Sequence, residues 1–150
     1  TMKIALCADA PYPVNAFIQA FLEDKGHICT LFGAFSLNTD VCWAHAGRTA
    51  AQAIANGTCE EGIFLCWSGT GISMVANKVP GVRAALCTDA GTAQAARIWN
   101  HANVLALSHR LITNDLAAEI LEAWFATPMD QRAKEAVKVL QEMDASRLSP

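Results

Sequence analysis

The chain has 150 residues, a net charge of −3 and an apolar fraction of 53%. This length predicts one domain over residues 1–150, and the mild acidity without a basic block argues against nucleic acid as a partner. No apolar run approaches the roughly 20 residues of a membrane span, so no membrane partner is expected. The N-terminus begins like a strand rather than a signal peptide, and the six cysteines form no CxxC pair. We therefore expect a cytoplasmic protein with reduced thiols and no metal site.

Strand and helix patterns alternate along the chain. Short apolar runs predict strands at residues 2–7, 27–32, 62–66, 82–87 and 103–107. Apolar positions three and four residues apart predict helices from 14 to about 26, at 43–56, at 71–77, at 91–99, over 116–125 and at 130–143. The alternation predicts an α/β fold, a Rossmann-like three-layer αβα sandwich around a five-stranded parallel sheet of order 2-1-3-4-5.

Polar residues follow four of these strands. They are Asp9, the segment 66–71, the pair 88–89 and the segment 108–110. Ligands of such sheets bind beyond the carboxyl ends of the strands, near the switch between the first and third strands. We therefore expect these residues to converge on one crevice.

The third strand carries the strongest chemical signal, because it ends in a thiol and runs through a Gly-rich turn into a helix. Cys66 ends the strand, and Ser68, Gly69, Thr70 and Gly71 form the turn. A helix N-terminus offers free N–H donors and a positive dipole end, which favour a thiolate and can hold an oxyanion. We expect these five residues to be catalytic. The alternative for the thiol is a small buried hydrophobe.

Other residues near this turn have two interpretations each. Asp9 either binds a ligand or forms a turn. Arg110 either holds an anion or forms an ion pair at a dimer interface. Trp43, Trp67 and Trp99 either fill the core or form an apolar wall of the site.

The glycines do not complete the rival motifs that they suggest. A dinucleotide-binding fingerprint would need a third glycine where Met74 stands. A cysteine-phosphatase loop would need an arginine at Ile72, and a response regulator would need a carboxylate at Cys66.

Several motifs together carry a resemblance to a known family. They are Lys3-Ile4-Ala5, Asp9, Lys25-Gly26-His27, Phe32-Gly33, residues 66–78, 79–89 and 100–107, and Arg110. Through them, residues 2 to about 128 resemble ribose-5-phosphate isomerase B and the galactose-6-phosphate isomerase subunits. The resemblance implies a cofactor-free aldose–ketose isomerase (EC 5.3.1.-) of carbohydrate metabolism, of the ribose 5-phosphate/ribulose 5-phosphate type. It also implies a homodimer or dimer of dimers that uses the C-terminal helix for dimerisation and builds its active sites across the subunit interface.

The resemblance also assigns roles to residues. Cys66 would move a proton between C1 and C2 through an enediolate, and the amides of the 69–71 turn would stabilise its charge. Ser68 stands where the family has a Thr that handles sugar hydroxyls. Further substrate contacts are implied at Asp9 and Asn100 for the sugar and at Arg110 and Arg132 for the phosphate.

The chain departs from the family pattern at several positions. Ala10 replaces a His, Trp43 a Tyr, Trp67 a Gly, and Trp99 the ring-opening His, while the C-terminal arginines are thinned to Arg132. Bulky indoles favour an alternative substrate, a shorter or open-chain sugar phosphate such as a tetrose phosphate.

If ring opening is still needed, His101 or His109 is the candidate for it. Two other functions stay open at this point. They are a sugar-phosphate-binding homologue without catalysis and a non-catalytic subunit of a hetero-oligomer.

Overall fold

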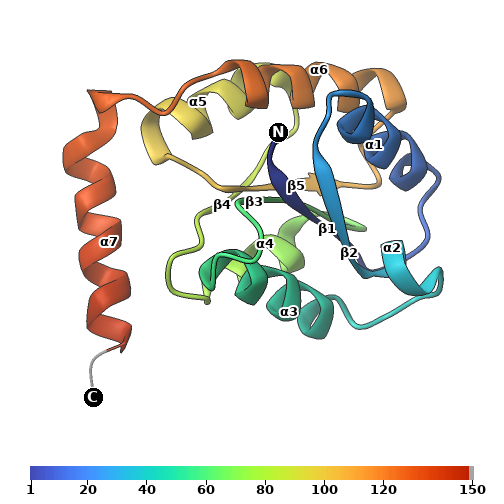
Figure 1. Cartoon of the computed structure of the whole chain (residues 1–150), viewed down its shortest axis with the longest axis horizontal. Helices are drawn as coiled ribbons and strands as arrows, with labels where there is room; N and C mark the ends of the chain where they lie inside the picture. The colour runs from blue at the N-terminus through green and yellow to red at the C-terminus, as the bar shows by residue number, and fades with distance from the viewer. Residues whose placement is uncertain (149–150) are drawn as a thin grey trace.

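The computed structural model, which describes residues 1–148, is a parallel sheet covered by helices on both faces (Figure 1). The strands are β1 (Lys3–Ala8), β2 (Ile28–Gly33), β3 (Glu61–Cys66), β4 (Ala84–Leu86) and β5 (Val104–Ser108). The helices are α1 (Pro13–Asp24), α2 (Ala34–Leu37), α3 (Trp43–Ala55), α4 (Thr70–Asn77), α5 (Ala90–Asn100), α6 (Asn114–Ala126), the 3₁₀ turn η1 (Gln131–Ala133) and α7 (Lys134–Leu148). The predicted αβα layering is confirmed. None of the helices in the described part of the chain has the length and apolar character to cross a membrane.

The strand order is 2-1-3-5-4, so the predicted order 2-1-3-4-5 is wrong. All residues of β5 are buried, whereas the short β4 is only partly buried. A strand that is apolar on both faces belongs inside a sheet, and a short, partly exposed strand belongs at its edge. β5 therefore pairs with β3, with Ser108 opposite Cys66. Asp89, one strand further out, caps α5 by accepting a hydrogen bond of 2.6 Å from the Thr92 N–H.

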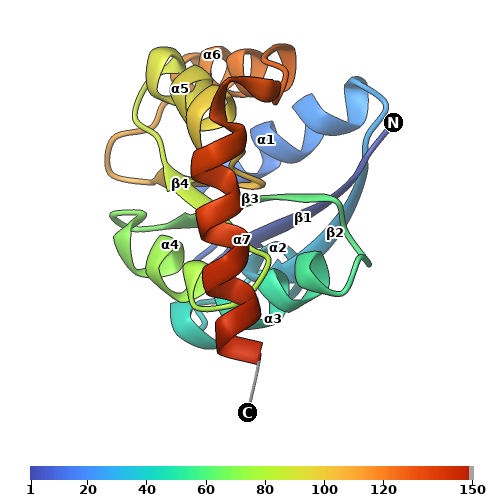
Figure 2. The same cartoon turned by 90° about the vertical axis from the view of Figure 1, so that its left-hand side faces the viewer.

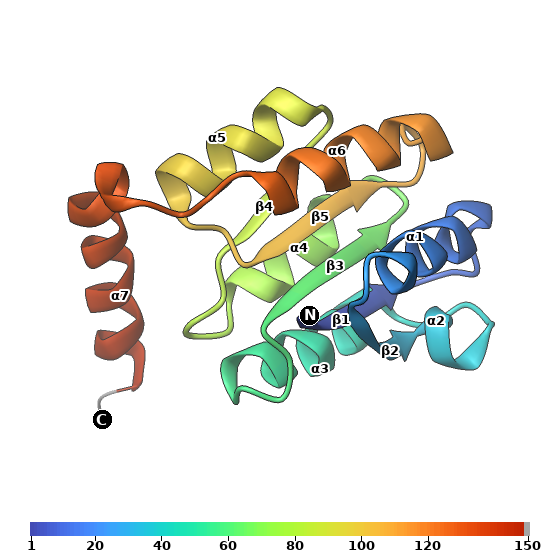
Figure 3. The same ribbon diagram turned by 45° about the horizontal axis from the view of Figure 1, so that its top comes forward.

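The two faces of the sheet carry different helices (Figures 1 and 3). α1, α5 and α6 cover one face, where Val14, Ile18, Ile120 and Leu121 are buried against β1, β3 and β5. α3 and α4 cover the other face. Alanines at 50, 51 and 53 let α3 lie close to the strands.

α7 stands apart from both faces (Figure 2). It lies beside the ends at which the parallel strands begin, called here the amino edge of the sheet; the ends at which they finish are called the carboxyl edge. Its Asp144 carboxylate accepts a hydrogen bond of 2.9 Å from the Gly81 N–H. Its Arg147 guanidinium donates one hydrogen bond to the Asn77 carbonyl, at 3.4 Å, and another to the Lys78 carbonyl. These two bonds cap the end of α4. Apolar side chains of α7 stay exposed at Val139, Leu140 and Met143. Use of this helix in dimerisation remains a prediction.

A buried ion pair joins β3 to α5 and α6. Glu61 is 3% exposed, pairs with Arg97 at 2.8 Å and accepts a hydrogen bond of 2.7 Å from the Trp124 indole N–H. The Arg97 guanidinium also lies 4.7 Å from the Trp124 ring centroid and donates to the Ala102 carbonyl at 2.8 Å. These bonds fix the last turn of α5.

Replacement of Glu61 by Leu tests this network. The Glu61→Leu variant leaves the Arg97 charge and the Trp124 N–H buried without their acceptor. We expect its free energy of unfolding, measured by urea denaturation, to fall by about 3–5 kcal/mol. The double variant Glu61→Leu/Arg97→Met removes both charges and should be more stable than the single variant. A single variant as stable as the parent would contradict this assignment.

Candidate active site

Cys66 lies at the carboxyl end of β3 with a backbone donor on its sulfur. The Gly69 N–H donates to the Cys66 Sγ at 3.2 Å, and the side chain is 5% exposed. Gly69 has φ +78°, and a Cβ on it would lie 2.5 Å from Leu86 Cδ1 and 3.0 Å from the Leu107 carbonyl. Only glycine fits this turn. The turn therefore brings a backbone N–H back onto the Cys66 sulfur as a hydrogen-bond donor.

The turn continues directly into α4, which begins at Thr70. The hydroxyls of Ser68 and Thr70 lie 2.7 Å apart. First-turn N–H groups lack acceptors within their own helix, which leaves those of Gly71 and Ile72 available to a ligand. A Cβ on Gly71 would lie 3.0 Å from the Trp43 ring, so this indole packs directly on the start of the helix. The structure thus brings the five predicted catalytic residues together with Trp43.

Asp9 joins this group from the neighbouring strand β1. Its carbonyl accepts a hydrogen bond of 2.8 Å from the Val41 N–H, and its carboxylate accepts one of 2.6 Å from the Tyr12 hydroxyl. The Tyr12 ring stacks on the His109 imidazole, with centroids 4.0 Å apart and planes at 11°. The His109 backbone N–H donates to the Cys66 carbonyl at 3.0 Å. Asp9, Tyr12 and His109 therefore form a continuous cluster beside the thiol.

Sequence reasoning did not single out Tyr12. It is the sole tyrosine of the sequence and lies three residues after Asp9, which is the signal that was available. His109 was considered only as a substitute ring opener. Its Nδ1 is buried and has no hydrogen-bond partner among residues 1–148.

Burial and nearby charge hold two of the neighbouring groups in their neutral forms. Burial, followed by the charges of Asp9 and Cys66, raises the pKa of the Cys7 thiol to about 12. Burial and the hydrogen bond to Asp9 raise the pKa of Tyr12. Cys7 is therefore a neutral thiol and Tyr12 a neutral donor at physiological pH, while Cys66 carries the backbone N–H contact.

Trp67 and Arg110 form the exposed rim next to Cys66. Trp67 is 61% exposed, and the Arg110 guanidinium carbon lies 5.1 Å from its ring centroid. The Arg110 backbone N–H and the Ser108 hydroxyl both donate to the Trp67 carbonyl, at 3.0 and 3.2 Å. The rim therefore presents one cation on an indole face, at the same sheet edge as the thiol.

Trp99, Asn100 and Arg132 lie at the amino edge of the sheet, whereas Cys66 lies at the carboxyl edge. α5 returns from the carboxyl end of β4, so its last residues, Trp99 and Asn100, lie where β5 begins (Figure 3). Arg132 pairs with Asp130 at 2.6 Å and lies 5.8 Å from the Trp99 ring centroid. The hydrogen bonds from Arg132 lower the pKa of Asp130 to about 2. Within one chain these three residues do not lie with Cys66.

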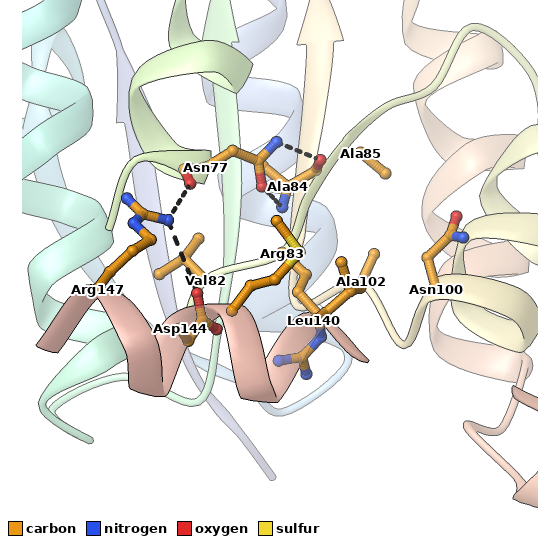
Figure 4. Close-up of a pocket in the computed structure, with 11 residues that line it drawn as sticks. Asn77, Val82, Arg83, Ala84, Ala85, Asn100, Ala102, Leu140, Asp144 and Arg147 are labelled. Atoms are coloured by element: carbon orange, nitrogen blue, oxygen red, sulfur yellow. Dashed lines mark hydrogen bonds and ion pairs between the residues drawn. The ribbon is translucent and has the colours of Figure 1, made fainter. Parts of the chain in front are cut away.

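A cavity of about 360 Å³ occupies this amino edge, between α7 and the end of α4 (Figure 4). Asn77 and Ala84 close it with two hydrogen bonds of 2.9 and 2.8 Å. Asn100 and Leu140 also line it. In the described residues, no cluster of three or more His, Cys, Asp or Glu side chains is arranged to hold a metal ion.

The chain is similar in sequence and in fold to several known proteins. A profile of the Ribose/Galactose Isomerase family matches residues 4–141. D-erythrulose-4-phosphate isomerase of Pectobacterium atrosepticum is 40% identical over 124 residues, which cover 82% of each chain. Ribose-5-phosphate isomerase B of Escherichia coli is 35% identical over 146 residues, covering 93% of this chain and 97% of the relative. The structure of ribose-5-phosphate isomerase B from Clostridium thermocellum superposes with a TM-score of 0.90 at 36% identity, covering 97% of this chain and 99% of that one.

The fold and these comparisons define a sugar-phosphate isomerase, an enzyme that interconverts aldoses and ketoses. The chain belongs to the ribose/galactose isomerase family, the family of ribose-5-phosphate isomerase B. Both the resemblance and the enzyme class EC 5.3.1.- inferred from the sequence are confirmed.

Proposed function

We propose that the protein isomerises a four-carbon sugar phosphate, a tetrulose 4-phosphate and its tetrose 4-phosphate, with Cys66 as the base. The observation that carries this proposal is the Trp67 indole directly after the thiol, with Arg110 stacked on it. Trp43 packs on Gly71 in the same turn, so two bulky indoles flank the segment that follows Cys66 and leave less room for a longer sugar. The relative from Pectobacterium, which is named for a four-carbon substrate, supports the same choice.

A tetrose 4-phosphate cannot close a furanose, because its terminal oxygen is esterified. Such a substrate is already open-chain and needs no ring-opening group. Trp99 in place of a histidine is then consistent with function. The ribose 5-phosphate type of reaction, expected first from the resemblance, becomes the less favoured substrate.

The turn between β3 and α4 supplies the groups that the proposed isomerisation needs. The Cys66 thiolate takes the proton from the carbon next to the carbonyl, and an enediolate forms. The Gly69 N–H donates to the sulfur at 3.2 Å and the Thr70 N–H donates to the Ser68 hydroxyl at 3.5 Å, so the remaining donors at the start of α4, the Gly71 and Ile72 N–H groups, stabilise the enediolate oxygen. Fixed donors act where charge develops and need no rearrangement during the step. Ser68 and Asp9 contact the sugar hydroxyls, and Arg110 faces the phosphate.

We further propose that a second copy of the chain completes each site. Trp99, which is 52% exposed, and its neighbours Asn100 and Arg132 lie at one sheet edge, and Cys66 lies at the other. A two-fold dimer can place one edge of each subunit against the other edge of its partner. Both edges expose large apolar side chains. They are Trp43, Trp67, Met74 and Leu111 at the carboxyl edge, and Trp99, Met129, Val139, Leu140 and Met143 at the amino edge and on α7.

The role of Cys66 can be separated from that of its neutral neighbour Cys7. We expect Cys66→Ala to reduce turnover of D-erythrulose 4-phosphate by about 10²–10⁴-fold, because the base is lost. The matched variant Cys7→Ala removes a neutral thiol that is buried in the same cluster of apolar side chains as Cys66. Its turnover should stay within a few-fold of that of the parent. Proton NMR in D₂O follows both turnover and deuterium incorporation. A parent protein that binds the sugar phosphate without any incorporation would be a binding homologue instead.

Substrate size is tested with a panel of sugar phosphates. The parent should give a kcat/KM for D-erythrulose 4-phosphate at least tenfold above that for ribose 5-phosphate. Trp67→Gly opens the rim and should shift this ratio toward ribose 5-phosphate, whereas Trp67→Phe keeps most of the bulk and should preserve it. Ribose 5-phosphate as the best substrate of the parent by a wide margin would rule out the four-carbon proposal.

Complementation tests the shared site. Cys66→Ala and Asn100→Ala should each be inactive alone, but their mixed heterodimer contains one intact site. Equal amounts refolded together should therefore recover about a quarter of the parent activity in a two-fold dimer. If each site lay within one chain, mixing would restore nothing. Mass spectrometry of the intact complexes checks that the heterodimer forms.

A further inference from the structure

Aldose–ketose isomerisation moves two protons, and Cys66 accounts for one of them. The carbon-bound proton goes through the thiol. The carbonyl oxygen must also gain a proton while the neighbouring hydroxyl loses one, which needs a second acid–base group within reach of both oxygens. No residue discussed above for the reaction fills this role.

We propose that His109 carries the oxygen-bound proton and that Tyr12, held by Asp9, positions it. This inference rests on the proposed function. His109 follows β5, and its backbone N–H bonds the Cys66 carbonyl at 3.0 Å, so its place next to the thiol is fixed by the sheet. The Tyr12 ring covers one imidazole face at 4.0 Å, and the Tyr12 hydroxyl is anchored on the Asp9 carboxylate at 2.6 Å.

The two nitrogens of His109 are not equivalent. Nδ1 is buried and has no hydrogen-bond partner in the described part of the chain, so Nε2 is the nitrogen that is left to meet a ligand. An imidazole whose ring plane is clamped by a stacked phenol keeps Nε2 in one direction. Such preorientation is what proton transfer to a bound oxygen requires.

Two of the other histidines are placed away from the thiol. His101 ends α5 at the opposite sheet edge, where its Nε2 lies 2.8 Å from the Asp130 carbonyl. His27 accepts a hydrogen bond from the Met2 N–H at 3.2 Å at the amino edge and stacks on Phe125. His109, by contrast, shares the carboxyl edge with Cys66.

The proton balance closes without any other reactant. From the aldose, the Cys66 thiolate takes the proton from C2 and the enediolate forms; the imidazolium then gives its Nε2 proton to the O1 oxygen, which yields an enediol. The neutral imidazole then takes the proton from the C2 hydroxyl, and the Cys66 thiol returns its proton to C1. The ketose leaves, and the thiolate and imidazolium are regenerated.

The test separates carbon exchange from isomerisation. In D₂O, NMR measures both deuterium incorporation into unreacted substrate and formation of product, with D-erythrulose 4-phosphate and with ribose 5-phosphate. His109→Gln should lower isomerisation by about 100-fold. Deuterium incorporation into unreacted substrate should fall much less, because Cys66 still forms the enediolate. The ratio of deuterium incorporated into unreacted substrate to product formed, called here exchange per turnover, should therefore rise. His109→Phe keeps a ring stacked on Tyr12 and should behave in the same way.

Two further variants sharpen the assignment. Tyr12→Phe keeps the ring stacked on His109 but removes its hydrogen bond to Asp9. It should raise exchange per turnover by a smaller factor than His109→Gln does. In the double variant Tyr12→Phe/His109→Gln, the Tyr12 change should have no additional effect. His45→Gln, an exposed histidine on α3, should match the parent. Circular dichroism and thermal unfolding confirm that each variant folds.

The inference would be overturned if His109→Gln or His109→Phe isomerised at the parent rate. It would also be overturned if exchange and isomerisation fell by the same factor. Failure of the proposed function has a different signature. In that case Cys66→Ala retains exchange, or ribose 5-phosphate replaces the four-carbon substrate while the His109 variants still raise exchange per turnover.

Discussion

The hydrogen bond from the Gly69 N–H to the Cys66 sulfur is the contact on which the site depends. It exists because residue 69 adopts a positive φ in a space bounded by Leu86 and the Leu107 carbonyl, where a Cβ does not fit. The same turn ends the strand and starts α4. One glycine therefore determines the environment of the thiol, the direction of the helix dipole and the position of the free amides.

The sequence predicted the local part of this arrangement well. Cys66 and the Gly-rich turn are adjacent in the chain, so their contact follows from a strand–turn–helix pattern. The order of the last two strands was wrong because pairing is a long-range property. Its signal was the completely apolar run of β5 beside the short β4. The stack of Tyr12 on His109 joins residues from two separate strand ends, which no periodicity reveals.

The division of the proposed site between two sheet edges follows from the topology. A helix that connects parallel strands returns to the amino edge, so any residue at the end of α5 is carried away from the carboxyl edge. Trp99 and Asn100 cannot meet Cys66 of their own chain without loss of this fold. The buried Glu61–Arg97 pair fixes that last turn of α5 to β3, and so makes the distance between the two edges a rigid property of the subunit.

The tryptophans and the proposed substrate have a common physical explanation. A substrate that cannot form a ring removes the need for a ring-opening histidine, and a shorter carbon chain leaves volume that must be filled to exclude water from the enediolate. Trp99 stands where the ring-opening histidine is no longer needed. Trp67 and Trp43 supply the bulk that a shorter carbon chain requires. In this proposal the Arg110 guanidinium, stacked on the Trp67 face, provides the positive charge for the phosphate of the short substrate.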